Sequence, residues 1–411
     1  MKDFIIKTAA VISVISLLIF PANAAGEYSE ADMEMDMGEV DEAIFLEDDT
    51  DYTAAIDVAA PSAILMEKET GTVIYEKNAD ERLLPASVTK VMTILLIIEA
   101  VESGRISLDD MITTSAYAAS MGGSQVYLEE GEQMALREML KCIVVSSAND
   151  AAVAVAEHIA GSEQAFAELM NEKAASLGME NSHFTNCTGL LDSDEHYTSA
   201  RDIAIMSAEV IKYDWIKEYT TIWMDSIRGG EFGLSNTNKM IRFYEGATGL
   251  KTGYTSKAGH CLAATAERDG MELIAVVLNC DSSNNRFESA KIMLNYGFAN
   301  YTLVEKLAGD EQLSVPVKLG AEDTVNAVLN ESGKLLVRRN AAPSITRTVT
   351  LEPEVTAPVE EGQKLGTLTI SDGTNTIAEL DLVAEAEVAA LTWWDVFSRM
   401  LSTVFFGTEQ R

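Results

Sequence analysis

The chain has 411 residues and a formal net charge of -35, because 65 aspartate and glutamate residues face only 30 lysine and arginine residues. Such an acidic protein repels nucleic acid, so we expect no nucleic-acid partner. The length allows two or three domains, and a hydrophobic fraction of 47% allows a sizeable core.

The N-terminus has the pattern of a secretory signal peptide, which we expect over residues 1–24. Lys2 and Lys7 accompany an apolar run from Thr8 to Phe20, and Ala22-Asn23-Ala24 forms a cleavage site of small residues. The apolar run is too short to span a bilayer comfortably. We therefore expect the mature protein to be secreted and to work outside the cytoplasm.

Residues 25–55 are predicted to form a disordered spacer. The part from 26 to 52 holds twelve acidic residues and neither lysine nor arginine. A block of like charges of this kind usually stays unfolded. It lacks the spacing of a calcium-binding EF-hand loop, so we expect no metal here.

The main domain is expected over residues 56–302. Strands are predicted at 62–66 and 72–75, joined by a hairpin turn at 69–71. Helices are predicted at 136–145, 151–160, 162–177, 199–211 and 285–296, and further strands at 250–255, 260–267 and 273–279. This order indicates an α+β fold, in which both ends of the domain build one antiparallel sheet around an inserted helical subdomain.

Two smaller regions follow. Short alternating runs between proline-rich turns predict an all-β domain over residues 303–385. Residues 388–411 are predicted to be an amphipathic helix with two tryptophans, which favours a membrane surface over docking on the protein's own core. A membrane-spanning helix is disfavoured, because Asp395 and Arg399 would lie in hydrocarbon.

Neither the cysteines nor the histidines have the spacing of a metal site, and we expect no metal and no cofactor. The cysteines allow three disulfide pairings, but three of them lie in apolar segments where buried free thiols are favoured. They are Cys142, Cys187, Cys261 and Cys280. The histidines are His158, His183, His196 and His260, of which His183 is expected to be a structural hydrogen-bonding residue.

The most informative stretch is Pro85-Ala86-Ser87-Val88-Thr89-Lys90, which opens an apolar run to Ile98 that predicts a buried helix. Ser87 lies at the start of this helix, and Lys90 follows three residues later on the same side. The helix dipole and burial would lower the pKa of Lys90, so its neutral amine could activate the Ser87 hydroxyl. The alternative is a capping serine beside a lysine that extends to solvent, because S-x-x-K is common by chance.

Two further polar clusters interrupt apolar segments. Ser147-Ala148-Asn149 lies between two predicted helices, where it could face a cleft or form an ordinary loop and helix cap. Lys251-Thr252-Gly253 lies on a predicted strand, where glycine admits a ligand backbone and lysine offers a fixed cation. The alternative for Lys251 is an edge-strand lysine that prevents aggregation. Each cluster alone is a weak signal, but the three in this order are specific.

The three motifs are the signature of penicillin-interacting serine enzymes. The chain resembles the low-molecular-mass penicillin-binding proteins, the serine-type D-alanyl-D-alanine carboxypeptidases of peptidase family S11. Gly189-Leu190, the run 197–202 and the run 249–255 carry the resemblance further. It implies a transpeptidase fold like that of penicillin-binding proteins and β-lactamases, with the catalytic domain at 56–302 and a β-rich C-terminal domain.

The resemblance also implies a reaction. Neutral Lys90 would take the proton of Ser87, whose oxygen attacks the carbonyl between the two D-alanines of a peptidoglycan stem peptide. Ser147 would relay a proton to the leaving amine, and water would then hydrolyse the acyl-enzyme. A β-lactam would acylate Ser87 in the same site.

Further residues would bind the substrate. Asn149 would hydrogen-bond the peptide backbone, while Lys251 and Thr252 would engage the terminal carboxylate and Gly253 would let the substrate backbone approach closely. The backbone N–H groups of Ser87 and Tyr254 would hold the oxyanion. Tyr254 stands where some relatives carry histidine, which puts a side-chain contribution there in doubt.

The resemblance implies a peripheral location on the outer face of the cytoplasmic membrane, reached through the C-terminal helix. That helix has little net positive charge, so anchoring would depend on its apolar face. Two alternative functions remain for a protein with this fold. A serine β-lactamase would need a base for rapid deacylation, and residues 187–202 offer Glu195 without a recognisable arrangement. A non-catalytic wall-binding module is disfavoured by the intact motifs.

Overall fold

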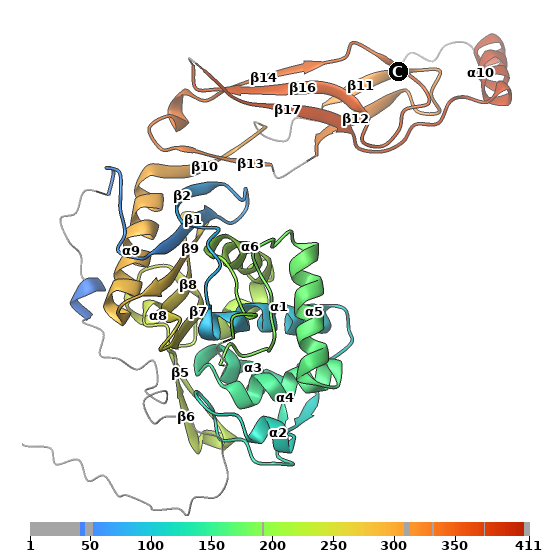
Figure 1. Ribbon diagram of the computed structural model, residues 1–411. Coiled ribbons are helices and arrows are strands. Elements are labelled where there is room, and N and C mark those ends of the chain that lie inside the picture. Colours follow the sequence, from blue (N-terminus) through green and yellow to red (C-terminus); the bar gives the residue numbers. More distant parts are fainter. Residues whose placement is uncertain are drawn as a thin grey trace, which may run out of the picture. The chain divides into compact units, whose positions relative to one another are not determined.

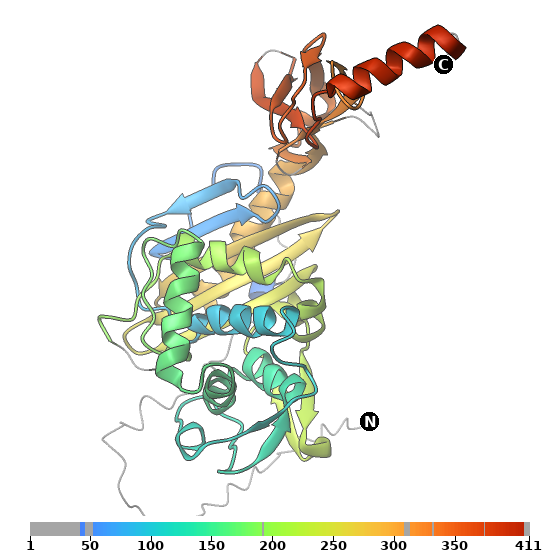
Figure 2. The same cartoon turned by 90° about the vertical axis from the view of Figure 1, so that its right-hand side faces the viewer.

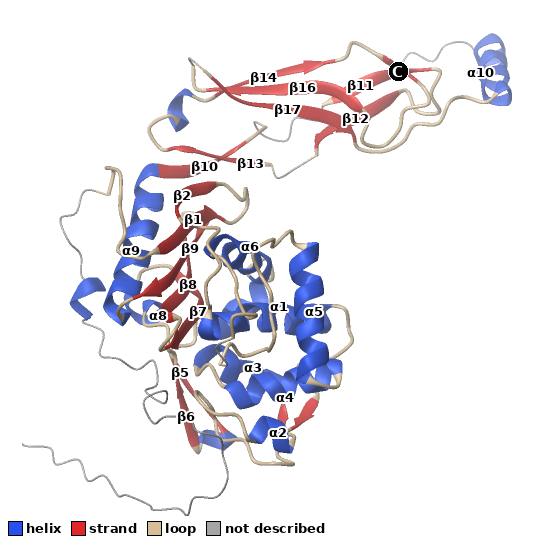
Figure 3. Cartoon of the chain, in the orientation of Figure 1, coloured by secondary structure: helices blue, strands red, loops and turns tan. Residues whose placement is uncertain are grey.

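The computed structural model describes residues 42–45, 52–190, 193–307, 313–330, 333–373 and 375–406. The predicted signal peptide at 1–24 lies outside these residues, as does the predicted spacer except for 42–45 and 52–55. The fold is the predicted α+β arrangement, with mixed helices and sheets and a C-terminal all-β domain, as Figure 3 shows by colour.

A five-stranded antiparallel sheet forms the centre of the main domain, in the order β2-β1-β9-β8-β7 (Figure 1). The two ends of the domain meet in it, as predicted, because β1 pairs with β9 and Ser62 lies opposite Leu278. Asp269 and Gly270 make the tight turn between β8 and β9, and both have positive φ. The strands are β1 (Ser62–Glu67), β2 (Val73–Lys77), β7 (Ala247–Thr255), β8 (Gly259–Arg268) and β9 (Met271–Cys280).

Helix α9 (Ser283–Asn300) covers one face of the sheet and the helical subdomain covers the other (Figure 1). Side chains along a strand point alternately to opposite faces. On β9, Leu273, Ala275 and Val277 belong to the core under α9, whereas Ile274, Val276 and Leu278 belong to the core shared with the helices. The sheet is therefore buried on both faces, which explains why its strands are almost continuously apolar.

The helical subdomain contains the predicted helices with small shifts. Ser162 and Ser199 cap α5 and α6, because their side-chain oxygens accept hydrogen bonds from the N–H groups of Ala165 and Asp202. The predicted helix at 151–160 begins two residues earlier, at Asn149. The helices are α1 (Lys90–Glu102), α2 (Ala116–Ala119), α3 (Leu136–Val145), α4 (Asn149–Ala160), α5 (Glu163–Ser176), α6 (Ala200–Val210), α7 (Lys217–Thr220) and α8 (Met240–Phe243).

Helix α1 is buried on every side from Lys90 to Ile98, as its uninterrupted apolar sequence predicts. Figure 2 shows it crossing in front of the central sheet. A single 3₁₀ turn, η3 (Ala86–Thr89), leads directly into it. Two small antiparallel sheets of two strands each belong to the same domain, β3 (Met111–Thr113) with β4 (Gln133–Ala135) and β5 (Met224–Ile227) with β6 (Phe232–Ser235).

Within its described residues, the predicted disordered spacer contains a 3₁₀ turn, η2 (Glu42–Phe45). The ring of Phe45 stacks on that of Phe243 with centroids 5.7 Å apart, and Lys291 donates a 2.6 Å hydrogen bond to the carbonyl of Ile44. The expectation of disorder is therefore wrong for these four residues. It followed from the acidic composition of the block and overlooked two adjacent apolar side chains that have an aromatic partner to bury against.

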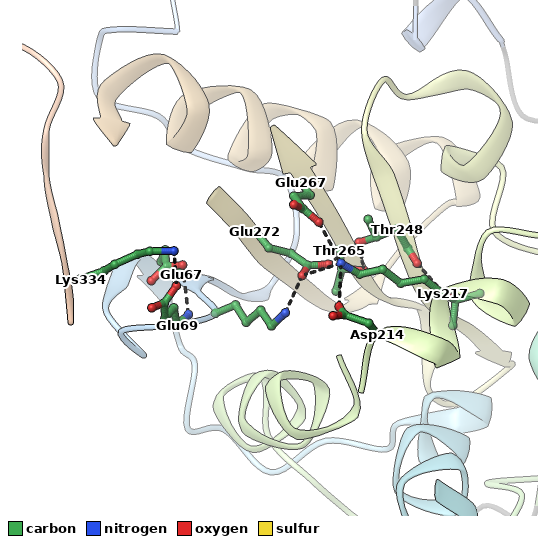
Figure 4. Close-up of polar contacts among 11 residues, drawn as sticks. Glu67, Glu69, Asp214, Lys217, Thr248, Thr265, Glu267, Glu272 and Lys334 are labelled. Atoms are coloured by element: carbon green, nitrogen blue, oxygen red, sulfur yellow. Dashed lines mark hydrogen bonds and ion pairs between the residues drawn. The ribbon is translucent and has the colours of Figure 1, made fainter. Parts of the chain in front are cut away.

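An ion-pair network around the buried carboxylate of Glu272 holds one end of the central sheet (Figure 4). Glu272 on β9 is 4% exposed and accepts from Lys68 at 2.9 Å and from the hydroxyl of Thr248 at 2.8 Å. Lys217 lies 3.4 Å from Glu272 and 2.8 Å from Glu267. A buried carboxylate requires such partners, and here they tie the beginning of β7 to β9.

The C-terminal domain is all-β, as predicted, with a six-stranded sheet in the order β14-β16-β17-β12-β11-β15. Alternate residues of β16, such as Leu368 and Ile370, are buried in its core. Strand β10 (Tyr301–Glu305) pairs separately with β13 (Lys334–Arg338). The six strands are β11 (Ser314–Lys318), β12 (Thr324–Leu329), β14 (Thr346–Leu351), β15 (Val355–Thr356), β16 (Lys364–Ser371) and β17 (Thr376–Ala384).

The last described element is the helix α10 (Trp393–Phe406). Thr392 and Asp395 form a reciprocal cap at its start, since each side chain accepts a hydrogen bond from the other residue's N–H. Trp393 and Trp394 are 67% and 69% exposed, and the ring of Phe397 stacks on that of Trp393. Among the described residues, no helix is both long and apolar enough to cross a membrane.

Candidate active site

The structure brings Ser87 and Lys90 together at the junction of η3 and α1. The Lys90 Nζ lies 3.0 Å from the Ser87 Oγ. Lys90 is fully buried, whereas Ser87 is half-buried at the surface of the site. The alternative of a lysine that extends to solvent is therefore excluded, and the hydroxyl has an amine within hydrogen-bonding distance.

The surroundings of Lys90 fix the direction of its amine. Its Nζ lies 2.6 Å from the Asn149 Oδ1, 3.1 Å from the Thr188 carbonyl oxygen and 3.5 Å from the Ser147 Oγ. An amide oxygen and a backbone carbonyl can only accept hydrogen bonds, so they take the two N–H groups of a neutral amine. The nitrogen lone pair is then left to face the Ser87 hydroxyl.

Burial lowers the pKa of Lys90 well below its usual range, and the nearby positive charge of Lys251 lowers it further. Both causes favour the neutral amine, which can accept a proton. Burial acts on Lys90 in the predicted direction, and Lys251 adds an electrostatic contribution that the sequence does not reveal.

Asn149 has contacts that differ from those expected of a substrate-binding residue. While its Oδ1 accepts from Lys90, its Nδ2 donates a 2.8 Å hydrogen bond to the carbonyl of Gly122. The side chain is 1% exposed. Because α4 begins at Asn149, this residue is part of the helix rather than the preceding loop, and both ends of its amide are engaged within the protein.

Ser147 occupies the bend between α3 and α4. Its φ of 60° is uncommon for a residue other than glycine, and its side chain is buried beside Lys90. The bend is fastened to a neighbouring loop, since the N–H of Asn149 bonds to the Ser124 carbonyl at 2.7 Å. The Asp150 carboxylate accepts from the N–H groups of Val126 and Leu128 in the same loop. These bonds hold the Ser147 hydroxyl on the Lys90 side of the site.

Lys251, Thr252 and Gly253 lie on β7, at the edge of the central sheet. Lys251 is 1% exposed and donates a 2.9 Å hydrogen bond to the Thr252 carbonyl, so it does not serve as an exposed edge lysine. The Thr252 hydroxyl donates to that of Thr237 at 2.6 Å. The positive charge and the two hydroxyls therefore line the strand close to Lys90.

Gly253 is required by the protein's own backbone, which is a different reason from the predicted approach of a ligand. A Cβ atom on Gly253 would lie 2.8 Å from the Pro85 carbonyl oxygen and 2.9 Å from the backbone nitrogen of Ser87. Strand β7 thus passes directly against η3. Tyr254, the next residue, stacks on His260 of β8 with ring centroids 4.4 Å apart.

Arg286 was not identified from the sequence, although it lies behind this strand. It is fully buried at the start of α9, with its Nη1 3.4 Å from the Gly253 carbonyl and its Nη2 2.7 Å from the Ser283 hydroxyl. A single arginine in an otherwise ordinary helix gives no signal of such a position. It adds a second buried cation to the region of Lys251.

The role of the segment 185–189 was also not predicted, although Gly189 is part of the resemblance: the segment places the Thr188 carbonyl beside Lys90. Gly189 has a φ of +71°, and a Cβ atom there would lie 1.9 Å from the Ala86 carbonyl oxygen. The Thr93 hydroxyl donates to the Cys187 carbonyl at 2.6 Å. The Asn-Cys-Thr-Gly sequence is typical of a turn, and this was the signal available.

The remaining candidates have structural roles. All four cysteines, each in the described part of the chain, are free and buried, in agreement with the preference for free thiols. The His183 Nδ1 lies 2.5 Å from the Glu195 carbonyl, as expected of a structural histidine. Glu195 itself is exposed. The described residues include no group of three or more His, Cys, Asp or Glu side chains that could hold a metal ion.

Comparison with known proteins gives two family matches. Residues 49–282 match a family described as D-alanyl-D-alanine carboxypeptidase, peptidase S11. Residues 298–390 match the C-terminal domain of penicillin-binding protein 5.

Individual proteins match along most of their length. The chain is 40% identical over 349 residues to the D-alanyl-D-alanine carboxypeptidase DacF of Bacillus subtilis, covering 84% of this chain and 90% of that protein. It is 32% identical to DacC of Escherichia coli, covering 84% and 89%. The crystal structure of penicillin-binding protein 5 from Haemophilus influenzae superposes with a TM-score of 0.75 at 28% identity, over 82% of this chain and 99% of that one.

Proposed function

The chain belongs to the D-alanyl-D-alanine carboxypeptidases of peptidase family S11, and we propose that it removes the terminal D-alanine from peptidoglycan stem peptides through an acyl-enzyme on Ser87. The observation that carries this mechanism is the environment of Lys90. In the neutral amine, the two obligate acceptors take the N–H groups, which leaves the lone pair for the Ser87 hydroxyl at 3.0 Å. A serine needs such a base to become a nucleophile.

In the acylation step, the Lys90 amine takes the proton of Ser87 while the Ser87 Oγ attacks the carbonyl carbon between the two D-alanines. The N–H groups of Ser87 and Tyr254 stabilise the negative charge that develops on the carbonyl oxygen. When the C–N bond breaks, the departing amine of D-alanine needs a proton. Ser147, buried beside Lys90, passes the proton from Lys90 to that amine.

In the second step, water attacks the ester carbonyl and its proton returns through Lys90 to Ser87, which releases the shortened peptide and regenerates the enzyme. Lys251 and Thr252 bind the carboxylate of the terminal D-alanine, which explains why a free C-terminus is required. Asn149 orients Lys90, because its amide oxygen accepts a hydrogen bond from the amine. A β-lactam acylates Ser87 through the same first step.

The test is release of free D-alanine from diacetyl-L-Lys-D-Ala-D-Ala by the full chain and by a Ser87→Ala variant. The proposal predicts release by the wild type and none by the variant. A serine β-lactamase would instead hydrolyse penicillin rapidly and repeatedly, and a non-catalytic wall-binding module would take no covalent penicillin label. Either result would contradict the carboxypeptidase mechanism.

We also propose that the protein is secreted and attaches peripherally to the outer face of the cytoplasmic membrane. The signal-peptide pattern at 1–24 supports secretion. Exposed apolar side chains on α10 support attachment: Trp393, Trp394, Phe397, Met400 and Leu401. The Asp395 carboxylate accepts a hydrogen bond from the N–H of Thr392 at the start of this helix, so this charged group caps the helix end. Fractionation of cells that express the full chain would test both points.

A further inference from the structure

His196 is a buried histidine that the mechanism above does not use. It lies just before α6 and is 1% exposed. Its Nε2 is 2.8 Å from the Thr89 Oγ1, and its Nδ1 is 3.1 Å from the backbone nitrogen of Thr185. The ring also packs edge-on against Phe184. The imidazole therefore joins two segments that are distant in the sequence.

The hydrogen bonds define which nitrogen of His196 carries the proton. The backbone N–H of Thr185 can only donate, so Nδ1 must accept. Burial lowers the pKa of His196 to about 4, which keeps the ring neutral near neutral pH. The single ring proton is then on Nε2 and is donated to the Thr89 hydroxyl oxygen.

Both hydrogen-bonding partners of His196 belong to segments that contact the reacting groups. Thr89 lies between Ser87 and Lys90 in the chain, in the turn that presents the nucleophile. Thr185 begins the segment 185–189, in which the Asn186 Oδ1 accepts from the N–H groups of Thr188 and Gly189 at 3.1 Å and 2.7 Å. This segment ends on the Thr188 carbonyl that accepts from Lys90.

The two segments are packed without space between them. A Cβ atom on Gly189 would lie 2.5 Å from the Thr89 Oγ1, the same atom that accepts from His196. A displacement of the segment 185–189 would therefore move the Thr188 carbonyl relative to Lys90. Loss of that acceptor would free one amine proton to turn toward Ser87, where the lone pair is needed.

We propose that His196 is a positioning residue that holds the Thr188 carbonyl against Lys90 and so keeps the lone pair of the Lys90 amine directed at Ser87. This inference rests on the proposed function, because it concerns the base of that reaction. His196 does not touch the substrate or the reacting atoms. Its contribution is to the rate of acylation and not to the binding of the peptide.

The experiment compares three variants of the full chain: His196→Ala, His196→Gln and His183→Ala. Glutamine has one accepting and one donating end at about the separation of the two ring nitrogens, so it can satisfy Thr185 and Thr89 together. His183→Ala is the control, because His183 lies in the same region but bonds to the Glu195 carbonyl. The readouts are kcat and KM for D-alanine release, the rate of labelling by fluorescent penicillin, and the thermal midpoint.

We expect His196→Ala to lower kcat and the labelling rate by about 10- to 100-fold, which is the loss that a small misplacement of catalytic groups produces, with KM nearly unchanged. His196→Gln should restore most of the rate, and His183→Ala should match the wild type. If His196→Ala does not fold, Thr89→Val removes the accepting hydroxyl with little change of shape and should reproduce the loss.

The inference is overturned if His196→Ala or Thr89→Val folds and retains the wild-type rate. It is also overturned if folded His196→Gln loses as much activity as His196→Ala, or if the loss falls on KM. Each of these results leaves the wild-type activity intact and so leaves the proposed function standing. If the wild-type chain releases no D-alanine, both the proposed function and the inference about His196 are wrong.

Discussion

The amide oxygen of Asn149 lies 2.6 Å from the amine of Lys90, closer than the 3.0 Å between that amine and the Ser87 hydroxyl. The amide is held in this orientation because its nitrogen donates to the Gly122 carbonyl. A neutral acceptor so close to the lysine directs an N–H group away from the serine without adding a negative charge. Asn149 therefore helps to define the state in which Lys90 acts as a base.

An Asn149→Asp substitution is predicted to impair the base. A carboxylate at this distance would stabilise the ammonium form and raise the pKa of Lys90. Less of the lysine would then be neutral near neutral pH, and acylation by a β-lactam should slow by at least about tenfold, with the rate recovering only at higher pH. The measurement is the rate of penicillin labelling as a function of pH.

The matched control is Asn171→Asp, because the Asn171 amide also uses both ends, toward Phe184 and Ala167, but does not contact Lys90. This variant should lose stability and keep the wild-type pH profile. A profile of Asn149→Asp that superposes on that of the wild type would show that the amide does not set the protonation of Lys90.

Gly253→Ala is predicted to slow acylation by about 100-fold, because a new methyl group would meet backbone atoms of Pro85 and Ser87 that cannot rotate away. Strand β7 or η3 would have to move. Gly233→Ala on β6 is the control, since a Cβ atom there has no other heavy atom within 4 Å. Labelling rates and thermal midpoints of both variants test this, and equal behaviour would refute the close approach.

Acid should destabilise the protein through His196. The pKa of this ring falls from 6.5 to about 4 on folding, so the unfolded chain binds a proton that the folded chain excludes. The contribution of His196 to the free energy of unfolding is fully present above pH 6.5. It is lost as the pH falls toward 4, and the loss amounts to up to about 3 kcal/mol. Urea unfolding at about pH 7 and about pH 4.5 measures this loss.

The Gln variant serves as the comparison, because glutamine does not titrate in this range. On acidification, the unfolding free energy of the wild type should fall relative to that of His196→Gln. A constant difference between the two pH values would mean that His196 is protonated equally in the folded and unfolded chains.

Helix α10 is predicted to bind phosphatidylcholine vesicles and to remain bound at high salt, because its exposed face is apolar rather than basic. The double substitution Trp393→Glu with Phe397→Glu should abolish sedimentation with vesicles and leave the hydrolysis of a soluble peptide unchanged. Ile377→Glu, at an exposed apolar position on β17, is the control. Binding that disappears in salt, or that survives the double substitution, would exclude this mode of attachment.

Much of the fold could be predicted because its signals are local. The uninterrupted apolar run after Lys90 predicts a buried helix, and Ser162 and Ser199 mark helix starts that the structure confirms. The Asp269-Gly270 turn predicts the β8–β9 hairpin. The motif residues Ser87 and Lys90 could be recognised as a pair because a three-residue spacing places them on one side of a helix.

The remaining parts of the site depend on contacts between distant segments. Thr89 and His196 are separated by 107 positions, and no pattern in either segment indicates their hydrogen bond. The Thr188 carbonyl is a backbone group, which the sequence cannot distinguish from any other. The role of Asn149 depends on a helix that begins two residues earlier than predicted. The ordered position of Phe45 depends on an aromatic partner, Phe243, nearly two hundred positions away.

The central claim is that a neutral Lys90 amine activates Ser87, and the most direct test is the rate of Ser87 acylation by fluorescent penicillin in the wild type and in Lys90→Arg. An arginine side chain has a similar length, but its guanidinium stays protonated and cannot accept the proton of Ser87. We expect rapid labelling of wild-type Ser87 and no labelling of folded Lys90→Arg at any pH. Labelling of Lys90→Arg at the wild-type rate would contradict it.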